Sequence, residues 1–177
     1  TFHIGKSSFP FQGSPEFCYK ILSHYGLGSG HLSKVMSSFD GYLNAGIGSS
    51  AAAAVALIGA INRTKGLGMS IYDIAMAAWE LEVEEIGLFG GKQDQFAAAY
   101  GGVNVMKFKK GDVDVTPLAH KFIEKIAECL FLFFTGTTRE NPKIQEQMKE
   151  LTPQRIRAFD LIKKTCIDAI DPIAQGD

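Results

Sequence analysis

The sequence lacks an excess of either charge, since 18 lysines and arginines stand against 19 aspartates and glutamates, for a net charge of −1. A protein that binds nucleic acid needs clustered basic side chains to displace counterions from the phosphates. Lysine pairs occur at Lys109–Lys110 and Lys163–Lys164, but such pairs are typical of a solvated turn or helix face. The charge pattern therefore predicts no nucleic-acid partner.

Long apolar runs and cysteine motifs are also missing. The longest apolar run, Ala51–Ile61, is far shorter than the roughly 20 residues of a membrane-spanning helix, and no basic-then-apolar start resembles a secretion signal. The three cysteines, Cys18, Cys129 and Cys166, have neither CxxC nor Cys/His spacing. Because Cys129 lies in an apolar run, we expect buried structural thiols. These absences predict no membrane partner and a reducing, cytoplasmic setting.

The 177 residues, 46% of them hydrophobic, suffice for one sizeable core, or for one domain with part of a second. Periodicity and turn residues predict an irregular mixture of helices and strands, which favours α+β over a doubly wound sheet. The helices are expected at Glu16–Tyr25, Ala51–Asn62, Ser70 to about Ile86, Gln93–Tyr100, Pro142–Leu151 and Pro153–Ile170. The strands are expected at Leu32–Phe39, Val103–Phe108, Val113–Thr116 and Leu130–Phe134.

Two of these elements are expected to be deeply buried. Ala51–Asn62 is apolar almost all round, which predicts a helix in the middle of the fold. Leu130–Phe134 is a continuous apolar run, which predicts a strand covered on both faces. The helix from Ser70 begins with Ser70 and Asp73, a pair that resembles a capping box.

The segment Gly46-Ile47-Gly48-Ser49-Ser50-Ala51-Ala52 directly precedes the predicted buried helix. Glycines let a backbone approach an anion closely, and a helix N-terminus offers unpaired N–H groups with a positive dipole end. The serines add hydroxyls that bind phosphate oxygens or a metal ion. The segment is therefore a candidate phosphate site.

Other readings of this segment stay open. The same residues also suit a plain helix start with serine caps and a tight glycine turn. Gly46-x-Gly48-x-x-Ala51 formally fits a dinucleotide fingerprint, but that motif requires an acidic residue about 20 positions later. The corresponding region, Thr64–Gly68, contains none. The Walker string Gly-x-x-x-x-Gly-Lys-Ser/Thr is absent.

A carboxylate falls on the apolar stripe of the helix that begins at Ser70. At about 100° per residue, Ile71, Ile74, Ala75 and Ala78 share one face and Glu82 returns to it, whereas Glu80 and Glu84 point away. Burial of a carboxylate is costly without a partner. Glu82 either reaches water, pairs with a basic side chain or binds a metal such as Mg²⁺, which prefers oxygen ligands.

An aspartate follows the second glycine-rich segment, Gly90-Gly91-Lys92-Gln93-Asp94-Gln95. Asp94 suits a helix cap. It equally suits the residue that positions an attacking hydroxyl and accepts its proton in phosphoryl transfer. Lys92 beside it either contacts phosphate or faces solvent.

These segments together resemble the GHMP kinases, the family that includes galactokinase, homoserine kinase, mevalonate kinase and phosphomevalonate kinase. Ala45–Ala52 is similar to the family's second motif. Glu80-Leu81-Glu82, the string Gly90–Gly102 and Phe133–Arg139 look closer to the branch of D-glycero-D-manno-heptose 7-phosphate kinases and bacterial fucokinases. The resemblance runs from about residue 40 to 140, and Gly90–Gly102 is its most specific part.

The resemblance implies ATP and Mg²⁺ as cofactors and a role for each residue. Ser50 and Glu82 would bind Mg²⁺, and Asp94 would be the catalytic aspartate. The ATP phosphates would be held by the residues of the first glycine segment, which are Gly46, Ile47, Gly48, Ser49, Ser50 and Ala51. The sugar or sugar-phosphate substrate would lie against Gly91, Lys92, Gln93 and Asp94.

The implied fold is α+β, with residues 1–108 as the GHMP kinase N-terminal, ATP-binding domain (ribosomal protein S5 domain 2-like) and 109–177 as part of a ferredoxin-like C-terminal domain. The family's first and third motifs are not found, Tyr42-Leu43-Asn44 replaces its proline-bearing lead, and members are about twice as long. We therefore expect a piece of a longer protein.

The implied reaction is phosphorylation of a sugar hydroxyl, above all the anomeric one of a heptose 7-phosphate. The alternatives are a fucokinase, a galactokinase or another sugar-1-kinase, and, in a different class, a non-catalytic sugar- or nucleotide-binding sensor. The sequence does not indicate an oligomeric state.

Overall fold

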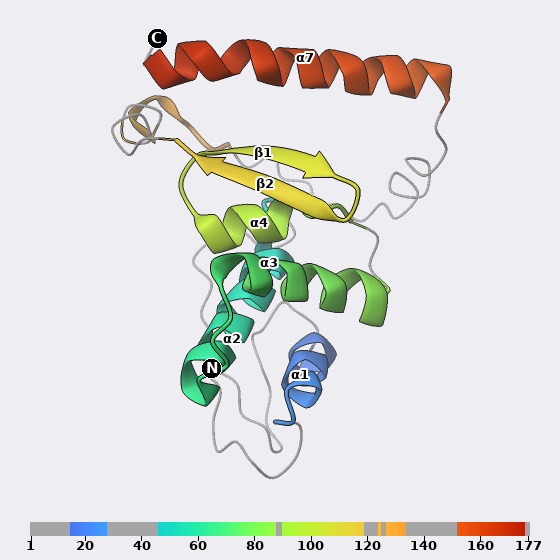
Figure 1. The fold of residues 1–177 in the computed structure, drawn as a ribbon, viewed down its shortest axis with the longest axis vertical. Coiled ribbons are helices and arrows are strands. Elements are labelled where there is room, and N and C mark those ends of the chain that lie inside the picture. Colours follow the sequence, from blue (N-terminus) through green and yellow to red (C-terminus); the bar gives the residue numbers. More distant parts are fainter. Residues whose placement is uncertain are drawn as a thin grey trace. The chain divides into compact units, whose positions relative to one another are not determined.

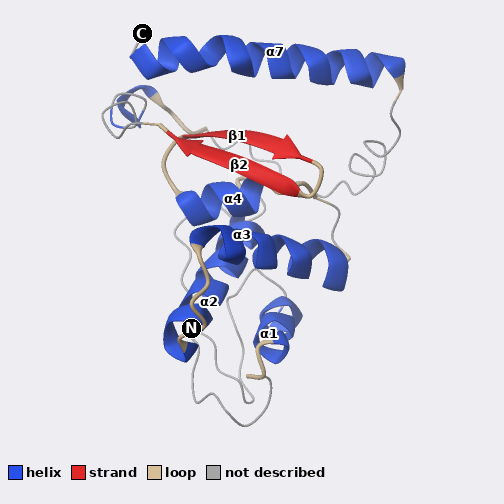
Figure 2. Ribbon diagram, in the orientation of Figure 1, coloured by secondary structure: helices blue, strands red, loops and turns tan. Residues whose placement is uncertain are grey.

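The computed structural model describes residues 15–27, 46–87, 90–118, 124, 127–133 and 152–175. The described residues form two compact units that part between Ala99 and Tyr100 (Figure 1). They contain helices and one pair of strands, in agreement with the predicted α+β class (Figure 2). Among them, no helix combines the length and the apolar character needed to cross a membrane.

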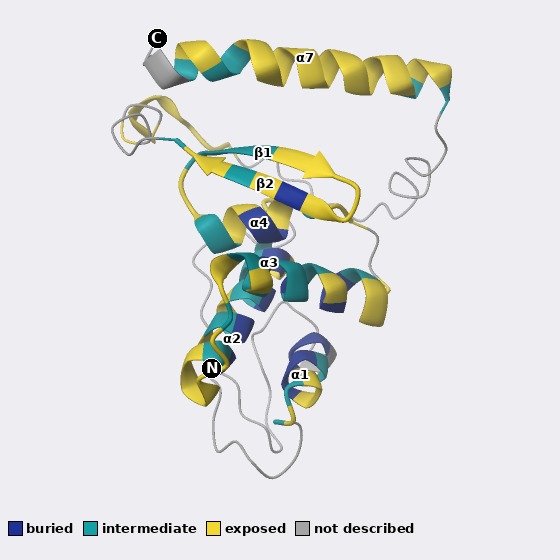
Figure 3. Ribbon diagram, in the orientation of Figure 1, coloured by how far each residue is buried: buried dark blue, intermediate teal, exposed yellow. Residues whose placement is uncertain are grey.

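Three helices and a short π-helix form the core of the first unit. Their bounds are α1 Pro15–His24, α2 Ser49–Lys65, α3 Ile71–Glu80 and η1 Leu81–Glu85. Buried residues from all four form one cluster, which contains Phe17, Cys18, Ile21, Leu22, Ala54, Ile58, Ile61, Ala78 and Leu81. Figure 3 shows the buried stretches of α1, α2 and α3 in dark blue. Burial of this apolar surface is what holds α1, α2 and α3 together.

A glycine follows the end of α1 and of α2, although α2 begins two residues before its predicted start at Ala51 and continues three residues beyond its predicted end at Asn62. Gly26 after α1 and Gly66 after α2 both have left-handed φ, of 69° and 63°, a conformation that costs glycine nothing. The predicted capping box opens α3, because Ser70 Oγ accepts a hydrogen bond from the Asp73 N–H at 3.1 Å. The prediction of α4, Gln93–Tyr100, is confirmed at both ends.

The second unit contains the antiparallel strands β1, Asn104–Lys109, and β2, Asp112–Pro117. Lys110 and Gly111 form the turn between them, with Gly111 at φ 82°, and Asp112 already belongs to β2. The prediction of both strands is confirmed, with ends shifted by one residue.

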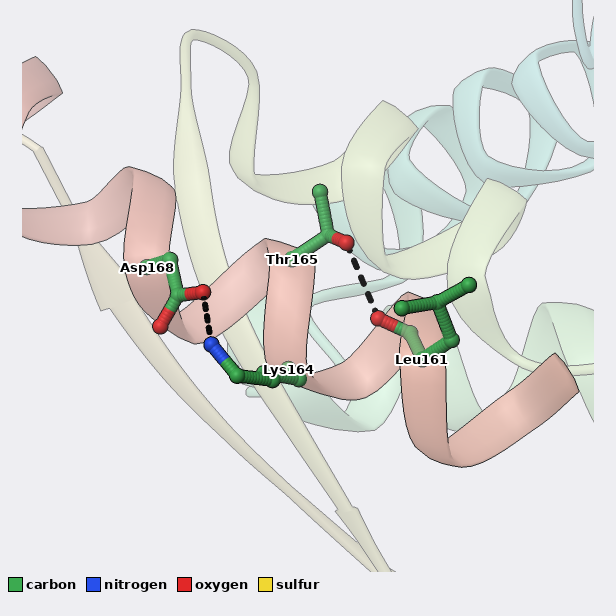
Figure 4. A network of polar contacts seen from close by, with 4 residues as sticks. All are labelled: Leu161, Lys164, Thr165 and Asp168. Carbon is green, nitrogen blue, oxygen red and sulfur yellow. Dashed lines mark hydrogen bonds and ion pairs between the residues drawn. The ribbon is translucent and has the colours of Figure 1, made fainter. Parts of the chain in front are cut away.

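The helix α7, Pro153–Gln175, also belongs to this unit. Thr152 Oγ1 accepts a hydrogen bond from the Arg155 N–H at 3.3 Å, and Pro153 occupies the first helical position, where no N–H is needed. Within the helix, Lys164 pairs with Asp168 and the Thr165 hydroxyl donates to the Leu161 carbonyl (Figure 4). The helix continues five residues beyond its predicted end at Ile170.

The prediction for Leu130–Phe134 is wrong in its described part. Residues 130–133 have no regular structure, and Leu130, Phe131, Leu132 and Phe133 are 69–83% exposed. A buried strand requires neighbours to pair with and layers to cover it, and the described sheet consists only of β1 and β2. An apolar run does not supply those neighbours.

The prediction of buried thiols holds for one cysteine of three. Cys18 is buried and burial raises the pKa of its thiol to about 11, whereas Cys129 and Cys166 are exposed. Cys18 lies on the face of α1 that joins the core cluster. Cys129 directly precedes the exposed run at 130–133, and no core cluster of the described residues buries its thiol.

The helix α2 is buried on one face rather than all round. Ala51, Ala54, Ile58 and Ile61 are buried, at spacings of three and four residues, while Ala56 and Ala60 are exposed. Exposed alanines cost little, so an all-apolar sequence does not require an all-buried helix.

Three predictions fall outside the described residues. They are the strand at Leu32–Phe39, the helix at Pro142–Leu151 and most of the segment Phe133–Arg139.

Candidate functional site

The first glycine segment leads directly into α2. Gly46 and Gly48 have left-handed φ of 75° and 71°, and Gly48 is the N-cap of the helix. Ser49 and Ser50 are the first two residues of the helix itself, and no side chain caps its start. The interpretation of the serines as helix caps is therefore wrong. Gly48 has no side chain with which to cap the first N–H groups of α2, and uncapped N–H groups at a helix start suit an anion.

The carboxylate of Glu82 is buried, as its position on the helix predicts. Its residue is 3% exposed, and its neighbours Glu80 and Glu84 are exposed. It lies in η1, where the helix widens to a π-turn instead of continuing as the predicted α-helix. Ile71 differs from the predicted stripe, since it is 52% exposed; burial of α3 begins one turn later, at Ala75.

Two side chains from other helices bind the Glu82 carboxylate. Gln95, in the first turn of α4, donates from Nε2 to Glu82 Oε2 at 2.5 Å, and the Ser50 hydroxyl of α2 also hydrogen-bonds it. Within the described ranges, no lysine or arginine forms an ion pair with Glu82. Glu82 thus joins the start of α2 to the start of α4.

Burial raises the pKa of Glu82 above its ordinary value. The hydrogen bonds from Gln95 and Ser50 act in the opposite direction, and the negative charge of Asp94 raises the pKa further. A carboxylate that is desolvated and faces a second carboxylate lacks positive charge, which a cation would supply.

Asp94 lies beside the first glycine segment. A Cβ added to Gly48 would lie 3.4 Å from Asp94 Cγ and 3.7 Å from its Oδ2. Asp94 is exposed and stands in the first turn of α4. A carboxylate therefore lies next to Gly48, the N-cap of α2.

The donor set at this point fits Mg²⁺. It comprises the Ser50 hydroxyl and the carboxylates of Glu82 and Asp94, all hard oxygen ligands. Gln95 is 5% exposed and its Oε1 has no hydrogen-bond partner in the described part of the chain. A buried carbonyl oxygen without a donor favours a cation or its bound water nearby. No group of three His, Cys, Asp or Glu side chains suited to a metal occurs among the described residues.

The remaining predicted site residues lie on the second glycine segment. The Gln93 amide covers Gly91, since a Cβ on Gly91 would lie 2.2 Å from Gln93 Oε1. Lys92 Nζ lies 4.4 Å from the ring centroid of Trp79 on α3. The structure thus brings Ser50, Glu82 and Asp94 together and places Lys92 against an aromatic ring.

Sequence reasoning missed two residues of this arrangement, Gln95 and Trp79. Gln95 directly follows Asp94, but its partner Glu82 is thirteen residues away. Trp79 is the chain's single tryptophan, and that rarity was the available signal. Neither role follows from local pattern, because one depends on how η1 meets α4 and the other on how α3 meets the segment that precedes α4.

Residues 16–102 match the family described as GHMP kinases N terminal domain. The chain is 34% identical over 137 residues to the D-glycero-alpha-D-manno-heptose 7-phosphate kinase of Campylobacter jejuni, an alignment that covers 75% of this chain and 40% of that protein. It is 32% identical over 137 residues to the mevalonate kinase of Pyrococcus horikoshii, covering 73% and 39%. The chain spans about two fifths of the length of these relatives. Through its residues 16–102, which contain the whole candidate site, the chain belongs to the GHMP kinase family.

Proposed function

We propose that this chain carries the phosphoryl-transfer site of an ATP-dependent sugar kinase. The observation that carries the proposal is the meeting of Ser50, Glu82 and Asp94 at the glycine-flanked start of α2. The similarity to a heptose 7-phosphate kinase supports the anomeric hydroxyl of a heptose 7-phosphate as the acceptor. The C-terminal residues 109–177 would then be part of a ferredoxin-like domain, and 1–108 the ATP-binding domain.

The start of α2 would hold the ATP phosphates. Left-handed Gly46 and Gly48 keep side chains away from the turn, so that the N–H groups of Ser49, Ser50 and Ala51 can donate to phosphate oxygens. The dipole of the 17-residue helix adds positive potential at the same point.

Ser50 and Glu82 would hold Mg²⁺. When bound, the ion neutralises charge on the phosphates and on the transferred phosphoryl group. Gln95 and the Ser50 hydroxyl fix the Glu82 carboxylate for this task through the hydrogen bonds that they donate to it.

Asp94 would orient the acceptor hydroxyl and take its proton. Its carboxylate is exposed and adjoins Gly48, so it borders the place where the transferred phosphate would lie. Gly91, Lys92 and Gln93 precede it in the chain and would contact the sugar. An ammonium at Lys92 suits an acceptor that itself carries a phosphate.

The first prediction concerns turnover. ADP release is measured with ATP, Mg²⁺ and a panel containing a heptose 7-phosphate, fucose, galactose and mevalonate, the last because of the second relative. The assay uses the 177-residue chain and any longer natural product that contains it. We expect turnover with the heptose phosphate, and a loss of about 10²–10⁴-fold in kcat in Asp94→Asn, because the proton acceptor is removed.

Asp160→Asn is the matched control, since Asp160 is an exposed residue of α7. Absence of turnover with every acceptor contradicts the kinase proposal and favours the binding sensor. Preference for a sugar without phosphate contradicts the heptose phosphate assignment alone.

A further inference from the structure

Trp79 contacts the second glycine segment at two points. Its Nε1–H donates a hydrogen bond to the Gly90 carbonyl at 3.3 Å. The Lys92 ammonium lies over its ring in a cation–π contact, 4.4 Å from the ring centroid. Gly90 and Gly91 are exposed and lack side chains, so the backbone here has more conformational freedom than at residues with a Cβ. The two contacts with Trp79 restrict that freedom.

Trp79 belongs to a row of side chains by which α3 and η1 hold α4. Tyr72, Trp79 and Glu82 are spaced by seven and three residues, which places them on one side of a helix. Tyr72 packs edge-on against the buried Phe96, with ring centroids 5.3 Å apart, and Glu82 binds Gln95. Trp79 completes the row at the point where α4 begins.

The position of Lys92 determines where α4 starts. The Lys92 carbonyl accepts the Phe96 N–H at 3.1 Å, so Lys92 closes the first turn of the helix. Asp94 stands in that turn, two residues later. A displacement of Gly90–Lys92 would therefore move the Asp94 carboxylate away from Gly48.

We infer that Trp79 is a positioning residue, which fixes Gly90–Lys92 and through it the Asp94 carboxylate at the start of α2. The contact itself stands independently of the reaction. Its importance for phosphoryl transfer rests on the proposed function of Asp94.

The contact is tested without substrate by amide hydrogen exchange over residues 90–96. Trp79→Phe keeps a ring for Lys92 and loses the N–H, so exchange there should quicken by about 3–10-fold. Trp79→Leu loses both contacts, so exchange should quicken by about 10–50-fold. Tyr19→Phe, which alters an exposed ring of α1, is the matched control and should change nothing in this segment.

Fluorescence gives a second readout, because Trp79 is the only tryptophan. Lys92→Ala uncovers one face of the ring, so acrylamide should quench the emission more strongly. Lys107→Ala, which removes an exposed lysine of β1, should leave quenching unchanged. Unchanged exchange in Trp79→Leu, or unchanged quenching in Lys92→Ala, overturns the contact.

Kinetic measurements then distinguish a residue that positions Asp94 for catalysis from one that only stabilises the segment Gly90–Lys92. With the acceptor that the wild type uses, Trp79→Leu should lower kcat by about 10-fold or more and leave the KM for ATP unaltered, since the start of α2 is intact. Faster exchange with unchanged kcat overturns the positioning role. A wild type without turnover removes the proposed function, and the positioning role with it, while the exchange result still decides whether Trp79 anchors the segment.

Discussion

At the scale of single residues, Gly48 is the position where backbone geometry and the site meet most directly. Its left-handed φ of 71° sets the start of α2, and the space a side chain would need is bordered by Asp94. Gly66 at the other end of the same helix has a similar φ of 63° but nothing within 4 Å of an added Cβ. The two glycines share a backbone conformation and differ in the end of α2 at which they lie and in what surrounds them.

This pair gives a prediction with an internal control. Gly48→Ala and Gly66→Ala should each lower the free energy of unfolding by about 1–2 kcal/mol, because both force a left-handed L-residue. Only Gly48→Ala should also weaken ATP binding, since it adds a methyl group beside Asp94 in the turn that is proposed to hold the phosphates. Urea unfolding and titration calorimetry measure the two effects, and equal ATP affinity in both variants would contradict the assignment.

At the scale of the element, α3 carries Trp79 and leads directly into η1 with Glu82, and a capping box forms its start. The Ser70 N–H donates to Asp73 Oδ2 at 2.8 Å, in return for the bond from the Asp73 N–H to Ser70 Oγ. The hydrogen bonds from the Ser70 side chain and backbone lower the pKa of Asp73. The ionised Asp73 therefore stabilises the fold.

We expect Ser70→Ala to lower the free energy of unfolding by about 1 kcal/mol at neutral pH. Because Asp73 has a lower pKa in the folded than in the unfolded chain, its contribution is complete above the unfolded value and disappears as pH falls through the folded one. The difference between wild type and Ser70→Ala should therefore shrink in acid. Ser49→Ala, at a helix start without a side-chain cap, is the control, and an equal loss there would argue against the capping role.

At the scale of the whole molecule, binding of nucleotide and metal should appear as stability. A ligand that binds only the folded state at about 100 times its Kd adds about 2.7 kcal/mol, which for a chain of this size corresponds to on the order of 5–10 °C in Tm. We expect a non-hydrolysable ATP analogue with Mg²⁺ to raise Tm by this amount, and EDTA to remove most of the rise.

The variant Glu82→Gln tests whether Glu82 is the residue that binds Mg²⁺. It removes a buried charge, so the ligand-free protein should be as stable as the wild type or more so, yet the part of the Tm rise that depends on Mg²⁺ should be lost. Glu84→Gln, two residues on and exposed, should retain it. A full Mg²⁺-dependent rise in Glu82→Gln contradicts the proposed metal site.

Local signals account for the features that the sequence predicted well. Gly26, Gly66 and the Ser70–Asp73 pair mark helix ends because their effects act within one turn of backbone. Helical periodicity placed Glu82 among buried residues, and the bounds of α4 and of the hairpin followed from glycines and alternation. Each of these depends only on neighbours in the chain.

Burial and pairing, in contrast, were decided by tertiary structure. The run at 130–133 is exposed and α2 has two faces, because cover comes from elements distant in the sequence. The roles of Gln95 and Trp79 likewise depend on how η1 meets α4 and on how α3 meets the segment that precedes α4. The sequence by itself predicted the candidate site residues and the helices on which they lie. Only packing decided that Ser50, Glu82 and Asp94 meet at one point, because no local interaction joins residues from three separate helical segments.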